Sequence, residues 1–156
     1  MGIVPKFGNG YIADKVMIFQ KRLEQAVIFT LNYLGESLAK YAKDNHTYTD
    51  RTGNLTNSIA YAVVKDKEIV YYDATTQPGV GAEEALKLAM KMAASLPNQY
   101  SLIIVAGMNY AAYVEAKGYN VILPAELKAK TEFPIVMKEL IAKANKKALE
   151  QFGMIA

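Results

Sequence analysis

The side chains of this sequence that could perform acid–base chemistry are carboxylates and one imidazole. His46 is the only histidine and cysteine is absent, which excludes thiolate nucleophiles, zinc sites built on sulfur or on histidine pairs, and most catalytic triads. Asp73 and Glu115 could form a glycosidase-like pair, but no spacing distinguishes them from the thirteen other acidic residues. We therefore expect structural or solvated roles for both carboxylates and an exposed turn position for His46. No catalytic residue, metal site or cofactor is predicted.

Two other segments could bind a charged ligand. Residues 79–84, GVGAEE, suggest a phosphate loop that opens a helix, but they lack the third glycine of a dinucleotide fingerprint and the Gly-Lys-Ser/Thr of a P-loop. Residues 1–116 carry eleven basic and eleven acidic side chains, whereas residues 117–156 carry seven and four, so the net charge of +3 lies there. The possible basic contact face consists of Lys138, Lys143, Lys146 and Lys147. We predict a plain helix start at 79–84 and a solvated lysine face, with DNA or an acidic partner as the alternative.

The composition predicts one packed domain over residues 1–156. Hydrophobic residues make up 52% and charged residues 21%, a balance typical of globular proteins. No run approaches the roughly 18 apolar residues of a membrane span, and the first residues lack the apolar core of a signal peptide. Arg22 and Arg51 are the only arginines, so the sequence does not favour a nucleic-acid partner. We expect a cytoplasmic protein without a membrane partner.

Apolar periodicity predicts a long N-terminal helix. An irregular arm is expected over residues 1–14, in which Asp14 offers an N-cap for a helix over 15–43. Within this helix Gly35 would mark close packing. Its apolar stripe recurs at three- and four-residue steps and consists of Phe19, Leu23, Val27, Thr30 or Leu31, Leu34, Leu38 and Tyr41.

Two further helices are expected. A middle helix over 82–96 would be buried through Leu86, Ala89, Met90, Ala93 and Leu96. A C-terminal helix would begin at Thr131, with Pro134 in its first turn, and end at Gly153. Its inner stripe would contain Val136 or Met137, Leu140, Ile141, Ala144, Ala148 and Phe152.

Period-two patterns predict a small sheet. Residues 58–65 and 68–74 read as a hairpin, whose first strand alternates large residues (Ile59, Tyr61, Val63) with small ones. Residues 100–106 are apolar on both faces, which is typical of a central strand covered on two sides. Residues 119–123 read as a further strand, and 109–117 as a short helix or a turn. The prediction is an α+β fold: a small antiparallel or mixed β-sheet packed against a long N-terminal helix, a middle helix and a C-terminal helix.

Aromatic usage is biased, with eleven tyrosines and no tryptophan. Tyrosine is enriched at protein interfaces because it combines an apolar ring with a polar tip. The simpler interpretation is that Tyr61, Tyr71 and Tyr72 cover the faces of the sheet.

Two turn-plus-strand patterns lie about fifty residues apart, TGNLTNSIAYAV at 52–63 and LIIVAGMNYAAYVE at 102–115. In the first, Gly53 permits a tight or positive-φ turn with Leu55 beneath it. In the second, we expect Tyr110, Tyr113 and Val114 to pack back on the sheet, with Glu115 at its edge. They resemble the minor tail and head–tail joining (tail-completion, neck) proteins of long-tailed bacteriophages, in which TG-x-L-x-x-S-I and Y-A-x-Y-V-E recur. The residues that carry the resemblance are Thr52, Gly53, Leu55, Ser58, Tyr110, Tyr113, Val114, Glu115 and Gly118. The chain departs from the usual V-E-F-G-T by reading VEAKG at 114–118, and it has YNVI at 119–122 in place of a Pro-rich stretch.

The resemblance implies a non-enzymatic virion structural protein of a phage or prophage. Copies would form a homo-oligomeric ring, contact other phage neck or tail proteins, and exist as monomers when free. The location would be the virion, and the bacterial host cytoplasm during assembly. Two other classes remain open: a small nucleic-acid-binding module that uses the basic C-terminal helix, and an enzyme with a carboxylate-based site in a deep pocket.

Overall fold

The computed structural model describes residues 9–73 and 75–153. Within these ranges the chain forms α1 (Asn9–Asp44), α2 (Asn54–Asn57), β1 (Ile59–Lys65), β2 (Glu68–Tyr72), α3 (Val80–Ser95), β3 (Tyr100–Ala106), α4 (Ala111–Ala116) and α5 (Leu123–Phe152). The predicted α+β class is confirmed, with a three-stranded antiparallel sheet packed against long helices. No described helix is apolar enough over its length to cross a membrane.

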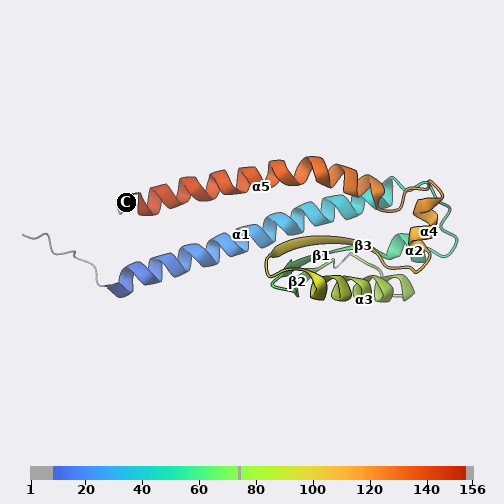
Figure 1. Cartoon of the computed structure of the whole chain (residues 1–156), viewed down its shortest axis with the longest axis horizontal. Helices are drawn as coiled ribbons and strands as arrows, with labels where there is room; N and C mark the ends of the chain where they lie inside the picture. The colour runs from blue at the N-terminus through green and yellow to red at the C-terminus, as the bar shows by residue number, and fades with distance from the viewer. Residues whose placement is uncertain (1–8, 74, 154–156) are drawn as a thin grey trace, which may run out of the picture.

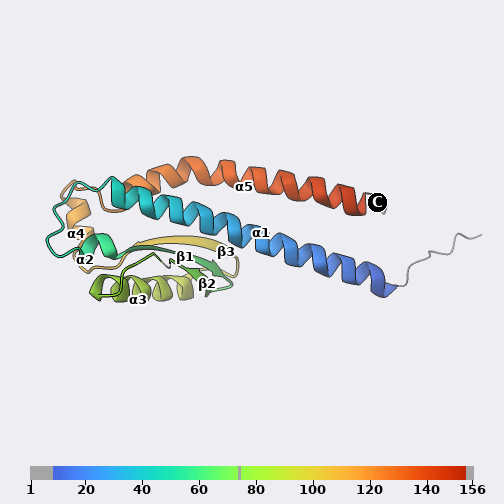
Figure 2. The ribbon, with the colours of Figure 1, turned by 180° about the vertical axis from the view of Figure 1, so that it is seen from behind.

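The elements are stacked in the order α5, α1, sheet, α3 (Figure 1). The short helices α2 and α4 lie together at one end of the molecule, as the view from behind also shows (Figure 2). At the opposite end α1 and α5 extend beyond the sheet as an antiparallel pair. We call residues 9–26 and 140–152 the helical arm. The rings of Phe19 and Phe152 join its two helices, with centroids 5.5 Å apart.

The sheet order is β2-β1-β3, so β1 is the central strand. The alternation predicted for β1 is confirmed. Ile59 lies in a core with Leu34 and Leu38 of α1, whereas the small residues Ala60 and Ala62 of β1 face the alanines of α3. A large face and a small face on the same strand thus allow two helices to pack at different depths.

Tyr61 and Gly35 determine how closely α1 approaches the sheet. A Cβ atom on Gly35 would lie 2.3 Å from Tyr61 Cδ2, which confirms that this glycine marks close packing. The Tyr61 hydroxyl donates to Asn32 Oδ1 at 2.5 Å, and its ring stacks on Tyr71. Burial raises the pKa of Tyr61 above its ordinary range. The tyrosine is therefore part of the core.

The ends of two helices differ from the prediction. Residues 9–14, expected to be irregular, are the first turns of α1, so Asp14 is not an N-cap. Residues 1–8 of the predicted arm lie outside the described residues. The C-terminal helix begins at Leu123 instead of Thr131, because Pro124 occupies its first turn, where proline needs no hydrogen-bond partner. Pro134 lies inside this helix.

Two strand predictions also need correction. Residues 119–123 form a turn and a helix start, held where the Asn120 N–H donates to Thr47 Oγ1 at 2.9 Å. The strand at 100–106 is covered on both faces, as predicted, but it lies at the edge of the sheet and not at its centre. Apolar residues on both faces of a strand indicate that helices cover both faces. They do not indicate whether the strand has a neighbouring strand on each side.

The buried face of α3 consists of small residues. Gly81, Ala85, Ala89 and Ala93 are buried, whereas Leu86 and Met90, predicted to be inside, are exposed. A helix that lies this close to a sheet has no room for large side chains. On α5, Ile141 of the predicted inner stripe is also exposed.

Candidate docking surfaces

The two signature segments meet at the end of the β1–β3 ladder. The Gly107 N–H donates to the Ser58 carbonyl oxygen at 3.0 Å, and the Met108 N–H donates to Ser58 Oγ at 3.3 Å. Ser58 Oγ in turn donates to the Leu55 carbonyl at 2.7 Å, and the side chain is fully buried. Ser58 therefore joins the turn that precedes β1 to the turn that follows β3.

The first signature forms the predicted turn. Gly53 has φ of 75°, and Leu55 is buried beneath it. Thr52 Oγ1 accepts from the Asn54 N–H at 3.3 Å. Asp50, just outside the signature, accepts from the Thr56 N–H through Oδ2 at 2.7 Å. These bonds hold the single turn of α2.

We expect the role of Asp50 to be visible in the pH dependence of stability. Burial raises the pKa of Asp50, but hydrogen bonds from Thr56, Gly53 and Leu55 outweigh this effect and hold the pKa below its ordinary value. A lowered carboxyl pKa contributes stability above the unfolded pKa, and this is lost as pH falls through the folded pKa. Because a hydrogen bond to a charged acceptor is stronger than one to a neutral amide oxygen, Asp50→Asn should lower the free energy of unfolding at pH 7 by about 1 kcal/mol. In urea titrations this difference should shrink by pH 3, and an unchanged difference would contradict the assignment.

Glu115 of the second signature caps α5. Its Oε2 accepts from the Val121 N–H at 2.5 Å, and its Oε1 accepts from the Leu123 N–H at 2.6 Å. A carboxylate at a helix N-terminus satisfies free N–H groups and interacts favourably with the helix dipole. Sequence reasoning placed Glu115 at a strand edge and missed this bond, because the start of α5 was predicted eight residues too late.

The tyrosines of the second signature do not pack back on the sheet as predicted. Val114 packs against the core, but Tyr110 is exposed and Tyr113 is 64% exposed. Tyr119, after the positive-φ turn at Gly118, is exposed as well. These three rings flank or belong to α4, at the end of the molecule away from the helical arm (Figure 1). We call Tyr110, Tyr113 and Tyr119 the tyrosine surface.

A second set of apolar side chains is exposed on the long helices. Phe29 and Tyr33, one turn apart on α1, are 72% and 69% exposed, and Leu149 on α5 is 72% exposed. The helical arm adds further exposed residues, namely Tyr11, Ile12, Val16, Met17, Ile18 and Ile141. Single exposed apolar residues are normal, but continuous sets mark contact surfaces. Phe29 and Tyr33 lie outside the apolar stripe predicted for this helix, and this position could have identified them from the sequence as exposed apolar residues.

Three of the four predicted basic residues line one groove. Lys143, Lys146 and Lys147 of α5 and Arg22 of α1 surround a groove of about 500 Å³ between the two helices of the arm. Its apolar lining comes from Phe19, Leu23, Ala26, Leu140 and Ala144. Lys138 is not among the lining residues, whereas the acidic Glu150 is. We call this site the basic groove. Sequence reasoning missed Arg22, which is distant in sequence from the lysines.

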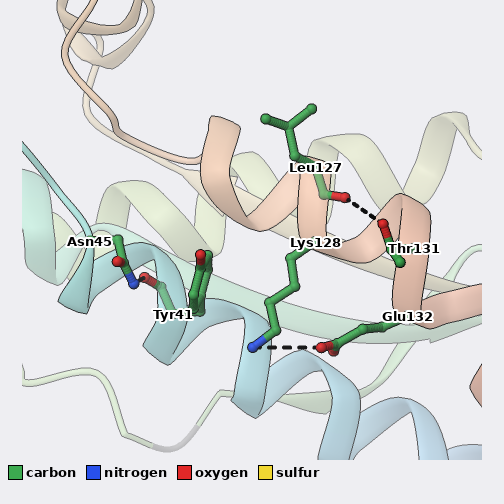
Figure 3. Close-up of polar contacts among 6 residues, drawn as sticks. All are labelled: Tyr41, Asn45, Leu127, Lys128, Thr131 and Glu132. Atoms are coloured by element: carbon green, nitrogen blue, oxygen red, sulfur yellow. Dashed lines mark hydrogen bonds and ion pairs between the residues drawn. The ribbon is translucent and has the colours of Figure 1, made fainter.

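The junction of α1 and α5 is held by a charged side chain over a ring (Figure 3). Lys128 Nζ lies 4.3 Å from the centroid of Tyr41 and 3.6 Å from Glu132 Oε1. On either side Asn45 Nδ2 donates to the Tyr41 carbonyl, and Thr131 Oγ1 donates to that of Leu127. Of these contacts, the one between Lys128 and Tyr41 joins the two helices, and the others lie within α5 or at the end of α1.

The remaining polar candidates are bound locally. Asp73 is 1% exposed, and its Oδ1 accepts from the Thr75 N–H and hydroxyl at 2.9 and 2.6 Å. His46 is exposed, with its ring 4.6 Å from that of Tyr48. Gly81 of the GVGAEE segment is buried, and a Cβ added there would lie 2.4 Å from the Asn54 carbonyl oxygen, so this residue packs against α2. The described ranges contain no cluster of three acidic or histidine side chains suited to a metal ion.

The comparison with known proteins leaves the family of the chain open. No protein-family model, no curated protein and no solved structure matches it. The functional argument therefore depends on the residues and surfaces described above.

Proposed function

We propose that this chain is a structural protein of a bacteriophage virion, a minor tail or head–tail joining component that acts by docking and not by catalysis. Copies would assemble as a homo-oligomeric ring in the virion and contact other neck or tail proteins. The host cytoplasm would be the site of assembly.

The observation that carries the proposal is the placement of exposed apolar side chains at both ends of an elongated chain. The tyrosine surface lies at one end, and the helical arm lies at the other. Burying one large apolar side chain contributes about 1.5–3 kcal/mol, so either surface can drive association. A cyclic ring requires two different complementary surfaces on each subunit, and the two ends of this chain differ in shape and composition.

The signature residues add support through their roles. Ser58 and Glu115 use their polar atoms for local bonds that fix the turn end of the molecule. The residues that carry the resemblance to phage joining proteins thus hold in place the end of the molecule that presents the tyrosine surface.

The proposal is tested on purified virions. Mass spectrometry of particles induced from the host genome should detect this chain at a fixed ratio to the portal protein. Finding it only in the soluble fraction of lysed cells would contradict a structural role.

A second candidate function is nucleic-acid binding through the basic groove, which the grouping of Arg22 with three lysines favours. Charge reversal tests it, with Lys138→Glu as the matched control on the same helix. Under the docking proposal, we expect no gel shift of duplex DNA at physiological salt for any variant. DNA binding that is lost in a Lys143→Glu, Lys146→Glu, Lys147→Glu triple variant, is retained in the control and falls steeply with salt would favour the second function.

A further inference from the structure

The outer edge of β3 has unpaired backbone groups. Gly107 N–H donates to Ser58 O, and Asp66 N–H donates to Gln99 O, so residues 99, 101, 103, 105 and 107 face β1. Because hydrogen bonding alternates along an antiparallel pair, the N–H and C=O groups of Tyr100, Leu102, Ile104 and Ala106 point away from it. Among the described residues these outward groups have no hydrogen-bond partner.

This edge also lacks the usual protection against strand pairing. Natural sheets protect their edges with charged residues, proline, bulges or covering elements. The sequence of β3, YSLIIVA, has no charge and no proline, and its pairing with β1 has no register shift. The opposite edge strand differs, since β2 begins at Glu68 and its pairing with β1 is interrupted between Val63 and Val64. Only the β3 edge is a regular, uncharged template.

Grooves run along the β3 edge on both faces of the sheet. One, of about 570 Å³, lies between β3 and α5 and is lined by Leu102, Ala129 and Phe133. The other, of about 550 Å³, lies at the Ala106 end between α3, α4 and the start of α5, and its lining includes Leu88 and Met92 of α3. Ile104 and Glu126 line both grooves, and Lys130 also lines the first. In Figure 1 no ribbon passes in front of β3.

We propose that this edge binds an extended segment of a partner protein, which adds to the sheet as a fourth strand beside β3. Strand addition obtains its affinity from main-chain hydrogen bonds and its specificity from pockets for alternate side chains. The outward groups of β3 supply the first, and the two grooves supply the second. Residues of α5 and of α3 line the grooves at this edge. A second copy would bring its own α3 and α5 to the same place, whereas a single segment brings no flanking helix, which favours a segment over the sheet edge of a second copy. The segment should carry apolar residues at alternate positions.

This inference goes beyond the proposed function, because it stands on hydrogen-bond direction and groove lining alone. It neither uses the tyrosine surface or the helical arm nor requires a virion. The two can therefore fail separately.

Hydrogen exchange of the free protein, measured by NMR, tests the open edge first. The amides of Leu102, Ile104 and Ala106 should exchange at least about tenfold faster than those of Ile103 and Val105. Equal protection of both sets in dilute protein would overturn the proposal. Protection of the outward set that rises with protein concentration would also overturn it, because the occupant would then be a second copy.

Peptide binding tests the occupant. The probe is a soluble library of nine-residue peptides, with Val, Ile, Leu or Tyr at alternate positions and Thr, Ser or Lys between them. Peptides selected on the wild-type chain should bind Ala106→Pro at least about tenfold more weakly by fluorescence anisotropy, since proline has no outward N–H. The matched control Ala106→Ser keeps that N–H and should bind within about twofold of wild type.

A second variant separates lost binding from lost folding. Phe133 is an exposed wall of the groove, so Phe133→Ala should leave the circular dichroism unchanged and weaken the selected peptides about fivefold. The proposal is overturned if alternating peptides are not enriched over scrambled ones. It is equally overturned if the selected peptides bind Ala106→Pro and Phe133→Ala as tightly as they bind wild type.

Discussion

Replacing Gly107 by alanine is expected to lower the free energy of unfolding by about 3 kcal/mol or more, the upper end for overpacked sites. A Cβ atom there would lie 2.2 Å from the Ala85 backbone N and 2.4 Å from Ala85 Cα. Both neighbours are backbone atoms of α3, so no side chain can rotate away. The whole helix would have to move off the sheet. Since domains are stable by about 5–15 kcal/mol, thermal unfolding should occur roughly 10 °C lower.

Gly10→Ala is the matched control for this prediction. Gly10 also lies in the described chain, but nothing lies within 4 Å of a Cβ built on it. Gly10 lies in the first turn of α1, where the change in helix propensity is smaller than the about 1 kcal/mol of a helix interior, so Gly10→Ala should leave the stability close to that of the wild type. If Gly107→Ala melted like the wild type, α3 would not pack over the second signature as described.

Removing the carboxylate of Glu115 is expected to have the next largest effect. Glu115→Ala leaves the N–H groups of Val121 and Leu123 without their acceptors and should cost about 2 kcal/mol in urea unfolding. Glu115→Gln keeps one acceptor and loses the charge, so it should fall between alanine and wild type. A stabilising effect of either substitution would be expected of a strained catalytic carboxylate and would contradict the capping role.

Glu126 provides the control, because it lies in the first turn of the same helix. Its Oε1 is 2.8 Å from Lys130 Nζ in an exposed pair four residues apart. Such pairs contribute about 0.3–0.5 kcal/mol, so Glu126→Ala should change stability far less than Glu115→Ala. A similar loss in both variants would mean that helix charge, and not the cap, is what Glu115 supplies.

The parts of the fold that the sequence predicted correctly follow from local patterns. Alternation of large and small residues in β1 reports its two faces, and Gly35 reports a close approach. The turn at Gly53 with Leu55 beneath it was predicted for the same reason, since φ above zero favours glycine. In each case the contact requires a particular residue size or a glycine at the position itself, so the sequence indicates it.

The errors arose where a distant element decides the outcome. Leu86 and Met90 are the larger apolar residues of α3, but the closeness of the sheet selects its alanines instead. The choice between Pro124 and Pro134 as the helix-start proline depends on Glu115, which supplies the cap from another helix. Tyr110 and Tyr113 have the spacing of an inward face, but α4 is short and only Ala111 and Val114 reach the core.

The basic groove could not be assembled from the sequence either. Its lysines lie close together on α5, but Arg22 and the apolar residues Phe19, Leu23 and Ala26 come from α1, more than a hundred residues away in the chain. The antiparallel pairing of α1 and α5 brings them together. Helix pairing belongs to the tertiary structure, and neither hydrophobic periodicity nor the number of charges predicts it.

The proposed docking role is tested most directly by deleting the gene from the phage or prophage to which the proposal assigns this chain and examining the particles by electron microscopy. We expect unjoined heads and tails or defective tails, with intact particles restored by the wild-type chain. A folded chain carrying Tyr110→Lys and Tyr113→Lys should fail to restore them. Normal, infectious particles in the absence of the chain would contradict the account.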